Sequence, residues 1–289
     1  MTIKRVLALG FFDGVHRGHV SILQEACRLA AELGAESGAV TFESHPRALV
    51  LGRAPDLITS FERRCDLIRE AGIQHVFALP FDQEMANTSP EAFATMLRDQ
   101  FGAVAVVCGE NFRFGKNAAG TPAFLEAFGL QVQVCKPVHS GKELVSSTRI
   151  RNCVREGHVH RAAQLLGRAF SLEGPVVSGY QVGRKLGFPT INVAPAAGGL
   201  IPRRGVYVTD VFIGGNVYRA VTNVGTRPTF TDADIVSIES HLLTFEGDLY
   251  GEVAEVRFLR YLRPERSFEN GDALRAQIAA DIEEARKTK

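Results

Sequence analysis

A change of rhythm along the chain divides the expected fold in two. In the first half, short apolar runs rich in β-branched residues alternate with stretches whose apolar residues recur every three or four positions. Strands alternating with helices predict a parallel sheet with helices on both faces and ligands at the carboxyl ends of the strands. The expected strands are Ile3–Leu9, Ala39–Phe42, His75–Leu79, Val104–Cys108 and Gln131–Cys135, and the expected helices are Gly18–Leu33, Ser60–Ala71, Pro90–Phe101 and Thr121–Phe128.

The second half has no helices between its strands. From Leu172 to Leu262 the segments are short, β-rich and separated by Gly or Pro, which predicts an antiparallel barrel or sandwich. A helical region over Thr148–Leu166 closes the first half, and apolar residues four apart at 274–282 indicate a final helix. We therefore expect two domains, residues 1–169 and 170–289.

Composition limits the partners and the compartment. The net charge of +1 gives no electrostatic footprint for nucleic acid. The five cysteines are odd in number and form no C-x-x-C pair, which is typical of reduced thiols in a cytoplasmic protein. The N-terminus lacks the apolar stretch of a signal peptide and no run reaches membrane-spanning length. We expect a cytoplasmic protein without a nucleic-acid or membrane partner, and the oligomeric state stays open.

The first strand ends in a glycine-punctuated turn, G-F-F-D-G-V-H-R-G-H (residues 10–19), and a helix follows. Glycines let the backbone approach a ligand closely, and the free N–H groups of a helix start favour an anion. Histidines beside that anion can neutralise charge that develops on a phosphate, although a pair three apart also occurs as surface residues or metal ligands. The candidates are Gly10, Phe12, Asp13, Gly14, His16, Gly18 and His19.

Two later segments of the first half are also polar. Residues 109–115, G-E-N-F-R-F-G, follow a strand and could cover a flat ring through Asn111 and Phe112, or form a plain turn with a hydrophobic anchor. Residues 146–151, S-S-T-R-I-R, place hydroxyls and guanidiniums at a helix start, where they suit phosphate oxygens or act only as a cap.

The two arginines of that second segment cannot act together. Arg149 and Arg151 are two apart on the expected helix, so they do not share a face. Only one of them is expected to meet phosphates, beside the hydroxyls of Ser147 and Thr148.

A glycine-rich segment opens the second half but is not a P-loop. Residues 179–185, G-Y-Q-V-G-R-K, have three residues between the glycines and no Ser or Thr after the lysine. Farther on, Thr190 and Asn192 point to one face of an extended chain, where two oxygen ligands suit a Mg²⁺ that holds ATP phosphates. An ordinary strand start after Pro189 is the alternative.

A carboxylate lies inside an apolar run farther along. A polar turn, N-V-G-T-R-P-T-F, begins at Asn223 and leads to the run that contains Glu239. The neighbours of Glu239 are apolar at both odd and even positions, so the sequence does not decide which side of the sheet its side chain faces. A partly buried carboxylate suits a general base for an alcohol, or it pairs with an arginine.

Seven motifs, taken together and in order over nearly the whole chain, resemble those of the bacterial bifunctional riboflavin kinase/FMN adenylyltransferases (FAD synthetases). Besides the segments from residues 10, 109 and 146, they are T-F-E-S-H-P (41–46), G-R-K-L-G-F-P-T-I-N (183–192), N-V-G-T-R-P-T-F (223–230) and E-S-H-L-L-T-F-E-G-D-L-Y-G (239–251). Three positions depart from the pattern: Phe11 stands where a small or polar residue is common, Asn111 where aspartate is, and Leu144 where some relatives have a basic residue.

The resemblance implies an α/β Rossmann-like nucleotidyltransferase domain followed by a riboflavin kinase-like antiparallel β-barrel with a C-terminal helix. The barrel would phosphorylate riboflavin to FMN, and the first domain would transfer AMP from ATP to FMN, giving FAD and pyrophosphate. Both reactions need ATP and Mg²⁺, and apo-flavoproteins are possible recipients of the FAD.

The resemblance also implies roles for the candidate residues. In the kinase, Glu239 takes the proton of the ribityl hydroxyl, Thr190 and Asn192 hold Mg·ATP, and Gly183, Arg184 and Lys185 cover phosphates, with Pro189 and Asn223 beside them. In the adenylyltransferase, His16 and His19 stabilise charge, Asn111 and Phe112 seat substrate, and Ser147, Thr148 and Arg151 bind phosphates.

Rival interpretations differ in which reactions occur. A monofunctional adenylyltransferase would use the barrel only to bind flavin, and the intact set of Thr190, Asn192 and Glu239 argues against it. A non-catalytic flavin-binding module would bind riboflavin without ATP turnover. The neutral net charge weighs against an RNA-binding relative of the aminoacyl-tRNA synthetases.

Overall fold

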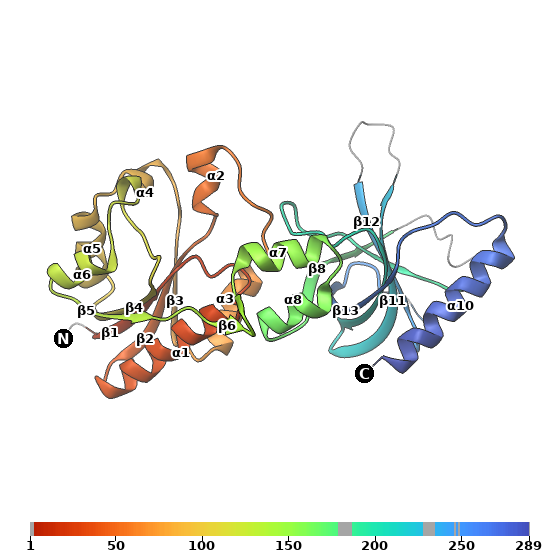
Figure 1. The fold of residues 1–289 in the computed structure, drawn as a ribbon, viewed down its shortest axis with the longest axis horizontal. Helices are drawn as coiled ribbons and strands as arrows, with labels where there is room; N and C mark the ends of the chain where they lie inside the picture. The colour runs from red at the N-terminus through yellow and green to blue at the C-terminus, as the bar shows by residue number, and fades with distance from the viewer. Residues whose placement is uncertain (1–2, 179–186, 228–234, 246, 248, 289) are drawn as a thin grey trace. The chain divides into compact units, whose positions relative to one another are not determined.

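The chain divides into two compact units, Met1–Ser147 and Thr148–Lys289 (Figure 1). The computed structural model describes residues 3–178, 187–227, 235–245, 247 and 249–288.

The division falls earlier than the expected boundary after residue 169. Helices α7 (Ser147–Arg155) and α8 (Val159–Leu166) lie almost wholly in the second unit, where α8 packs on strands of the barrel. The sequence predicted one helical region here, and Gly157, with φ of +82°, separates two helices instead. A side chain at Gly157 would also come within 3.3 Å of both Arg203 and Tyr261, so the break brings the backbone close to the barrel.

The first unit is built on a parallel sheet in the strand order β3-β2-β1-β4-β5, which confirms the predicted α/β fold. The strand order reverses at β1, because β2 and β3 lie on one side of it and β4 and β5 on the other. Ligands of such a sheet bind at the carboxyl ends of the strands beside that switch point. The strands are β1 (Arg5–Leu9), β2 (Glu36–Phe42), β3 (His75–Leu79), β4 (Ala103–Gly109) and β5 (Gln131–Cys135).

Helices cover both faces of this sheet. On one face, α1 (Arg17–Glu32) and α3 (Phe61–Glu70) bury an apolar stripe against strand residues that include Val6, Ala8 and Val107. On the other face, α5 (Pro90–Asp99) and α6 (Pro122–Ala127) bury Phe93, Leu97 and Leu125. Ser60, Ser89 and Thr121 cap three of these helices by accepting a backbone N–H, so local sequence sets where they begin.

The second unit is a closed barrel of antiparallel strands in the order β10-β11-β12-β9-β8-β13. Of the two architectures that the sequence predicted, a barrel or a sandwich, it is therefore the barrel. Its interior is filled by aromatic rings; Tyr207 and Phe258 meet edge to face with centroids 5.1 Å apart. The strands are β8 (Phe170–Val177), β9 (Ile191–Val193), β10 (Gly205–Ile213), β11 (Asn216–Arg227), β12 (Ile235–Leu242) and β13 (Val253–Arg263).

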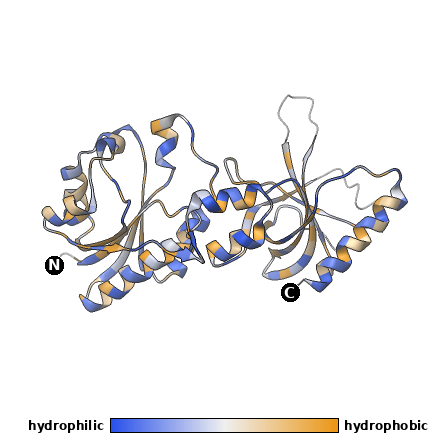
Figure 2. Ribbon diagram, viewed as in Figure 1, coloured by the Kyte–Doolittle hydropathy of each residue, from blue (hydrophilic) through white to orange (hydrophobic). Residues whose placement is uncertain are grey.

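The C-terminal helix α10 (Gly271–Lys287) covers part of the outer face of the barrel, as the apolar spacing predicted. Its residues Ile282 and Ala285 pack with Val206 and Val221 in one core cluster. Figure 2 shows apolar and polar residues alternating along α10, as they do in an amphipathic helix. The strands beneath α10 are therefore covered on both faces.

Several short elements were not predicted. They lie mostly in the loops around the carboxyl edge of the parallel sheet, where the chain must turn. They are α2 (Pro46–Leu51), α4 (Gln83–Asn87), the 3₁₀ turn η1 (Lys116–Ala118) and the hairpin of β6 (His139–Ser140) with β7 (Glu143–Leu144). Among the residues described, no helix is long and apolar enough to cross a bilayer.

Candidate active sites

The turn after β1 brings two imidazole rings together at the start of α1. His16 is the N-cap of this helix, and its Nδ1 accepts the backbone N–H of His19 at 3.2 Å. The two rings stack with centroids 3.6 Å apart and an angle of 16° between their planes. A nitrogen that accepts a hydrogen bond carries no proton, so the proton of the His16 ring lies on Nε2. The predicted pair therefore forms one stacked unit at the switch point.

This turn holds an unfavourable backbone conformation. Phe12 and Val15 have φ of +57° and +35°, values that cost of order 1–3 kcal/mol each outside glycine. Neighbouring segments hold them: the Thr41 hydroxyl donates to the Phe11 carbonyl at 3.0 Å, and the Gly14 N–H donates to the Thr59 hydroxyl at 3.2 Å. The site is therefore built in advance by contacts from distant parts of the first unit.

Asp13, a candidate ligand contact, is used to anchor the turn. Its side chain is only 3% exposed. One carboxylate oxygen accepts the backbone N–H of Ile58 at 3.0 Å and that of Thr59 at 3.4 Å. The Asp13 carbonyl also accepts the hydroxyl of Ser147 at 3.0 Å, which links another predicted site residue to the same turn.

Asp13→Ala is expected to lower the free energy of unfolding of the first unit by about 2 kcal/mol, because buried N–H groups lose a charged acceptor. Urea unfolding followed by hydrogen exchange in β1 measures the loss. The exposed Asp99→Ala, which removes an ion pair with Arg98, is the matched control and should change stability by less than about 0.5 kcal/mol. Wild-type stability of Asp13→Ala would show that the carboxylate does not anchor the turn.

A large aromatic cavity lies beside the loop that follows β4. It has a volume of about 760 Å³, and Phe112 lines it while Asn111 is exposed and outside the lining. Sequence reasoning selected Phe112 but none of the other walls as a site residue, although Phe42 and Pro46 lie in the motif at 41–46 and Phe114 in that at 109–115. The other aromatic and apolar walls are Phe42, Pro46, Leu49, Phe81, Met85, Phe93 and Phe114.

The predicted phosphate-binding segment forms the start of α7. Arg151 lies on the buried face of this helix and is 7% exposed, whereas Arg149 is half-buried and Thr148 is exposed. The two arginines thus occupy different surroundings, as their spacing predicted. Burial raises the pKa of Cys108, near the carboxyl end of β4, to about 11, so its thiol stays protonated at neutral pH and is a poor nucleophile.

In the barrel, strand register places polar residues side by side. Asn192 on β9 pairs with Glu239 on β12, and Glu239 pairs with Asn223 on β11. Directly paired residues face the same side of a sheet, so these three side chains form one row. Ile238 and Ser240 on either side of Glu239 are fully buried on the opposite, inner face. Glu239 therefore faces outward, which settles what its neighbours in the sequence left open.

A cavity of about 330 Å³ opens in front of this row. Glu239, Asn223 and Thr190 line it, and α10 closes it with Leu274 and Ile278. The Ser237 hydroxyl donates to the Glu239 carboxylate at 2.8 Å and orients it.

The segment that carries Thr190 is fixed beside the cavity. The ring Nδ1 of His241 lies 2.8 Å from the carbonyl of Pro189, another predicted site residue. Gly183, Arg184 and Lys185 lie outside the described residues.

Residues that the sequence analysis did not select close the cavity from the other side. Arg263 pairs with the buried Asp281 of α10, with Nη2 and Oδ2 2.8 Å apart, and its guanidinium lies 5.8 Å from the ring of Phe268. Glu265 accepts the side-chain N–H of Asn223 at 3.0 Å. Val206 on β10 pairs with Asn223 on one side and with Arg263 on the other, so Arg263 belongs to the same row across the sheet. The sequence does not show this relation, because it depends on how the strands of the barrel pair.

An α/β unit with a switch-point turn, joined to a closed barrel with its own polar cavity, is the architecture of a two-site enzyme. Residues 2–149 match the family model described as FAD synthetase, and residues 166–289 match that described as riboflavin kinase. The chain is 34% identical to the bifunctional riboflavin kinase/FMN adenylyltransferase of Bacillus subtilis, covering 98% of this chain and 92% of the relative. It is 35% identical to the protein of the same name from Pseudomonas fluorescens, covering 97% and 92%.

The chain belongs to the family of bifunctional riboflavin kinase/FMN adenylyltransferases, which confirms the resemblance found in the sequence. A solved structure from Streptococcus pneumoniae titled macrolide-efflux protein has the same fold, with a TM-score of 0.93 and 30% identity over 100% of this chain and 96% of that one.

Proposed function

We propose that this enzyme makes FAD from riboflavin in two ATP-dependent steps, at two separate sites. The observation that carries the proposal is the row of Asn192, Glu239 and Asn223 in front of a cavity in the barrel, separate from the histidine pair of the first unit. Residues 1–169, which are the first unit together with α7 and α8, supply the adenylyltransferase, and residues 170–289 supply the kinase.

The barrel site transfers a phosphoryl group to an alcohol. Riboflavin presents its terminal ribityl hydroxyl to Glu239, which accepts the proton as the oxygen attacks the γ-phosphorus of ATP; ADP leaves. The Ser237 hydroxyl holds the carboxylate in the orientation that this proton transfer needs. The apolar side chains of Leu274 and Ile278 offer a surface for the flavin.

Magnesium fits the oxygen donors of this site. Mg²⁺ retains several waters and usually takes only one or two protein ligands besides phosphates. Thr190 lines the cavity just before β9, and Asn192, which is buried, stands two residues farther on and pairs with Glu239. These two residues would hold the ion, which would neutralise charge on the phosphates of ATP.

The second proposed site transfers an adenylyl group. The phosphate of FMN attacks the α-phosphorus of ATP, the new phosphoanhydride bond forms, and pyrophosphate leaves. His16 and His19 stabilise the charge on the phosphates together with the N–H groups at the start of α1. Ser147, Thr148 and Arg151 bind phosphate oxygens at the start of α7, and the turn at Gly10, Gly14 and Gly18 lets the nucleotide approach.

The aromatic cavity of the first unit suits the flat ring of FMN. Its volume of about 760 Å³ and its walls of Phe42, Phe81 and Phe112 offer an apolar slot for the isoalloxazine system. Asn111 lies at the start of the same loop and offers a polar contact.

The product profile from riboflavin and Mg·ATP tests the proposal. Purified enzyme is expected to form FMN with ADP first, and FAD with pyrophosphate afterwards. FMN added alone with ATP should give FAD and pyrophosphate without ADP. A protein that makes FAD from FMN but no FMN from riboflavin would be a monofunctional adenylyltransferase whose barrel only binds flavin.

A further inference from the structure

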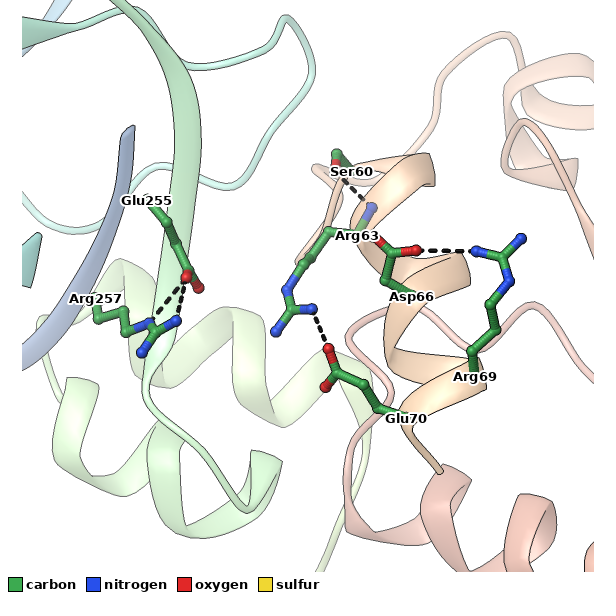
Figure 3. A network of polar contacts seen from close by, with 7 residues as sticks. All are labelled: Ser60, Arg63, Asp66, Arg69, Glu70, Glu255 and Arg257. Carbon is green, nitrogen blue, oxygen red and sulfur yellow. Dashed lines mark hydrogen bonds and ion pairs between the residues drawn. The ribbon is translucent and has the colours of Figure 1, made fainter. Parts of the chain in front are cut away.

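One arginine lies wholly inside the first unit, beside the turn that carries the histidine pair. Arg64 is on the first turn of α3 and is 0% exposed. Two other ion pairs of this helix, Asp66 with Arg69 and Arg63 with Glu70, reach solvent (Figure 3). Arginine is rarely buried completely unless a carboxylate neutralises it.

The contacts of Arg64 join three segments. Its Nη2 donates to the carbonyl of Phe42 at 2.6 Å and to that of Glu43 at 3.3 Å, at the end of β2. Its guanidinium lies over the ring of Phe11, 4.1 Å from the centroid. The arginine thus ties the end of β2 to the turn after β1 from a position on α3.

These contacts leave the charge poorly compensated. Within the described part of the chain, no carboxylate lies within ion-pair distance of Arg64, and its buried Nε and Nη1 have no hydrogen-bond partner. Burial lowers the pKa of Arg64, and the charge of Asp13 acts against that shift. A buried cation without a carboxylate partner lowers stability compared with an apolar residue of similar size. The fold alone therefore gives no reason to keep an arginine here.

The neighbouring site gives such a reason. Phe11 precedes Phe12, whose φ is positive and whose ring meets the imidazole of His19 edge to face, with centroids 5.4 Å apart. Movement of Phe11 would therefore be transmitted through Phe12 to the His19 ring. A displacement of about 1 Å at a reacting centre can cost about 10²-fold in rate.

We propose that Arg64 is a positioning residue for adenylyl transfer, which locks Phe11 against the end of β2 and so keeps His19 in place. This inference rests on the proposed function of the first unit. Arg64 acts through Phe11 and touches no substrate. It lowers the stability of the unit in exchange for an ordered site.

Arg64→Met in the full-length enzyme tests the inference. We expect kcat for FAD formation from FMN to fall about 10²-fold, with a change of less than about threefold in the KM for ATP. The urea midpoint of the first unit, followed by hydrogen exchange in β1 and β2, should stay the same or rise. Arg69→Met removes an exposed ion pair from the same helix and is the matched control for both measurements.

Two further variants separate positioning from a purely structural role. Arg64→Lys keeps the charge and should recover part of the lost kcat. Phe11→Leu should lower kcat by a similar factor, and the double variant with Arg64→Met should lose little more, because both changes break one contact.

Wild-type kcat in Arg64→Met would overturn the inference. So would a parallel fall of activity and urea midpoint that Arg64→Lys does not relieve, because that pattern belongs to a structural residue. Loss of FAD formation in His19→Ala, with full activity in Arg64→Met, would remove this inference and leave the proposed function standing. Full activity in both variants would remove the role of the histidine pair as well, whereas a wild-type enzyme that makes no FAD from FMN and ATP would remove the proposed function itself.

Discussion

His19→Ala lowers FAD formation from FMN by about 10²- to 10³-fold and leaves FMN formation from riboflavin within about twofold of the wild-type rate. The imidazole stacks on His16 at the start of α1, where the phosphates of ATP are expected, and alanine removes a donor to the charge that develops there. Separate assays of pyrophosphate release with FMN and of ADP release with riboflavin measure the two rates.

His75→Ala is the control for this prediction. His75 lies at the first residue of β3, at the opposite edge of the parallel sheet, and pairs with Glu36. Its removal should leave both rates unchanged. Equal loss of both activities in His19→Ala would contradict independent sites, and an unchanged rate of FAD formation would contradict the role of the histidine pair.

Glu239→Gln is expected to show the reverse pattern: phosphorylation of riboflavin falls by about 10²- to 10⁴-fold, because the amide cannot accept the ribityl proton. FAD formation from added FMN should continue at the wild-type rate. The amide keeps the size of the side chain and can still accept the hydroxyl of Ser237, so the loss reports proton transfer and not collapse of the cavity.

The exposed Glu252→Gln serves as the control for Glu239→Gln and should keep both activities. Riboflavin binding, followed by quenching of flavin fluorescence, should also survive in Glu239→Gln. A variant that binds riboflavin and still makes FMN at the wild-type rate would exclude Glu239 as the base.

The strands and most long helices could be predicted because their periodicity is local. The side of the sheet that Glu239 faces could not, because β12 ends at Leu242, and the apolar Leu243 and Phe245 just beyond it share the parity of Glu239. Only the pairing of Glu239 with Asn192 and Asn223 decides it. Inside β12 the residues at 237 and 241 are polar and those at 236, 238 and 242 are apolar, an alternation that the apolar residues after the strand obscure in the sequence.

Residues that act through distant partners were also beyond the sequence. Asp13 resembled a ligand contact because it lies among glycines, yet its partners Ile58 and Thr59 stand about 45 positions away. Nothing local marks Arg64 as buried, because the helix around it is rich in charge. Residue types that can bind or react, such as the histidines after β1, could be recognised at the ends of strands. The tertiary contacts that hold them in place could not, because they form only in the folded protein.

Because Asn192, Glu239 and Asn223 come from the three paired strands β9, β12 and β11, kinase activity depends on the correct register of these strands. A slip of one residue in β12 would turn Glu239 into the barrel and bring Ile238 or Ser240 to the cavity. Such a molecule could keep most of its main-chain hydrogen bonds and still make no FMN. The rate of FMN formation per folded barrel would then measure the fraction of molecules whose β12 has the correct register. Spectroscopic measures of strand content cannot distinguish these molecules from slipped ones.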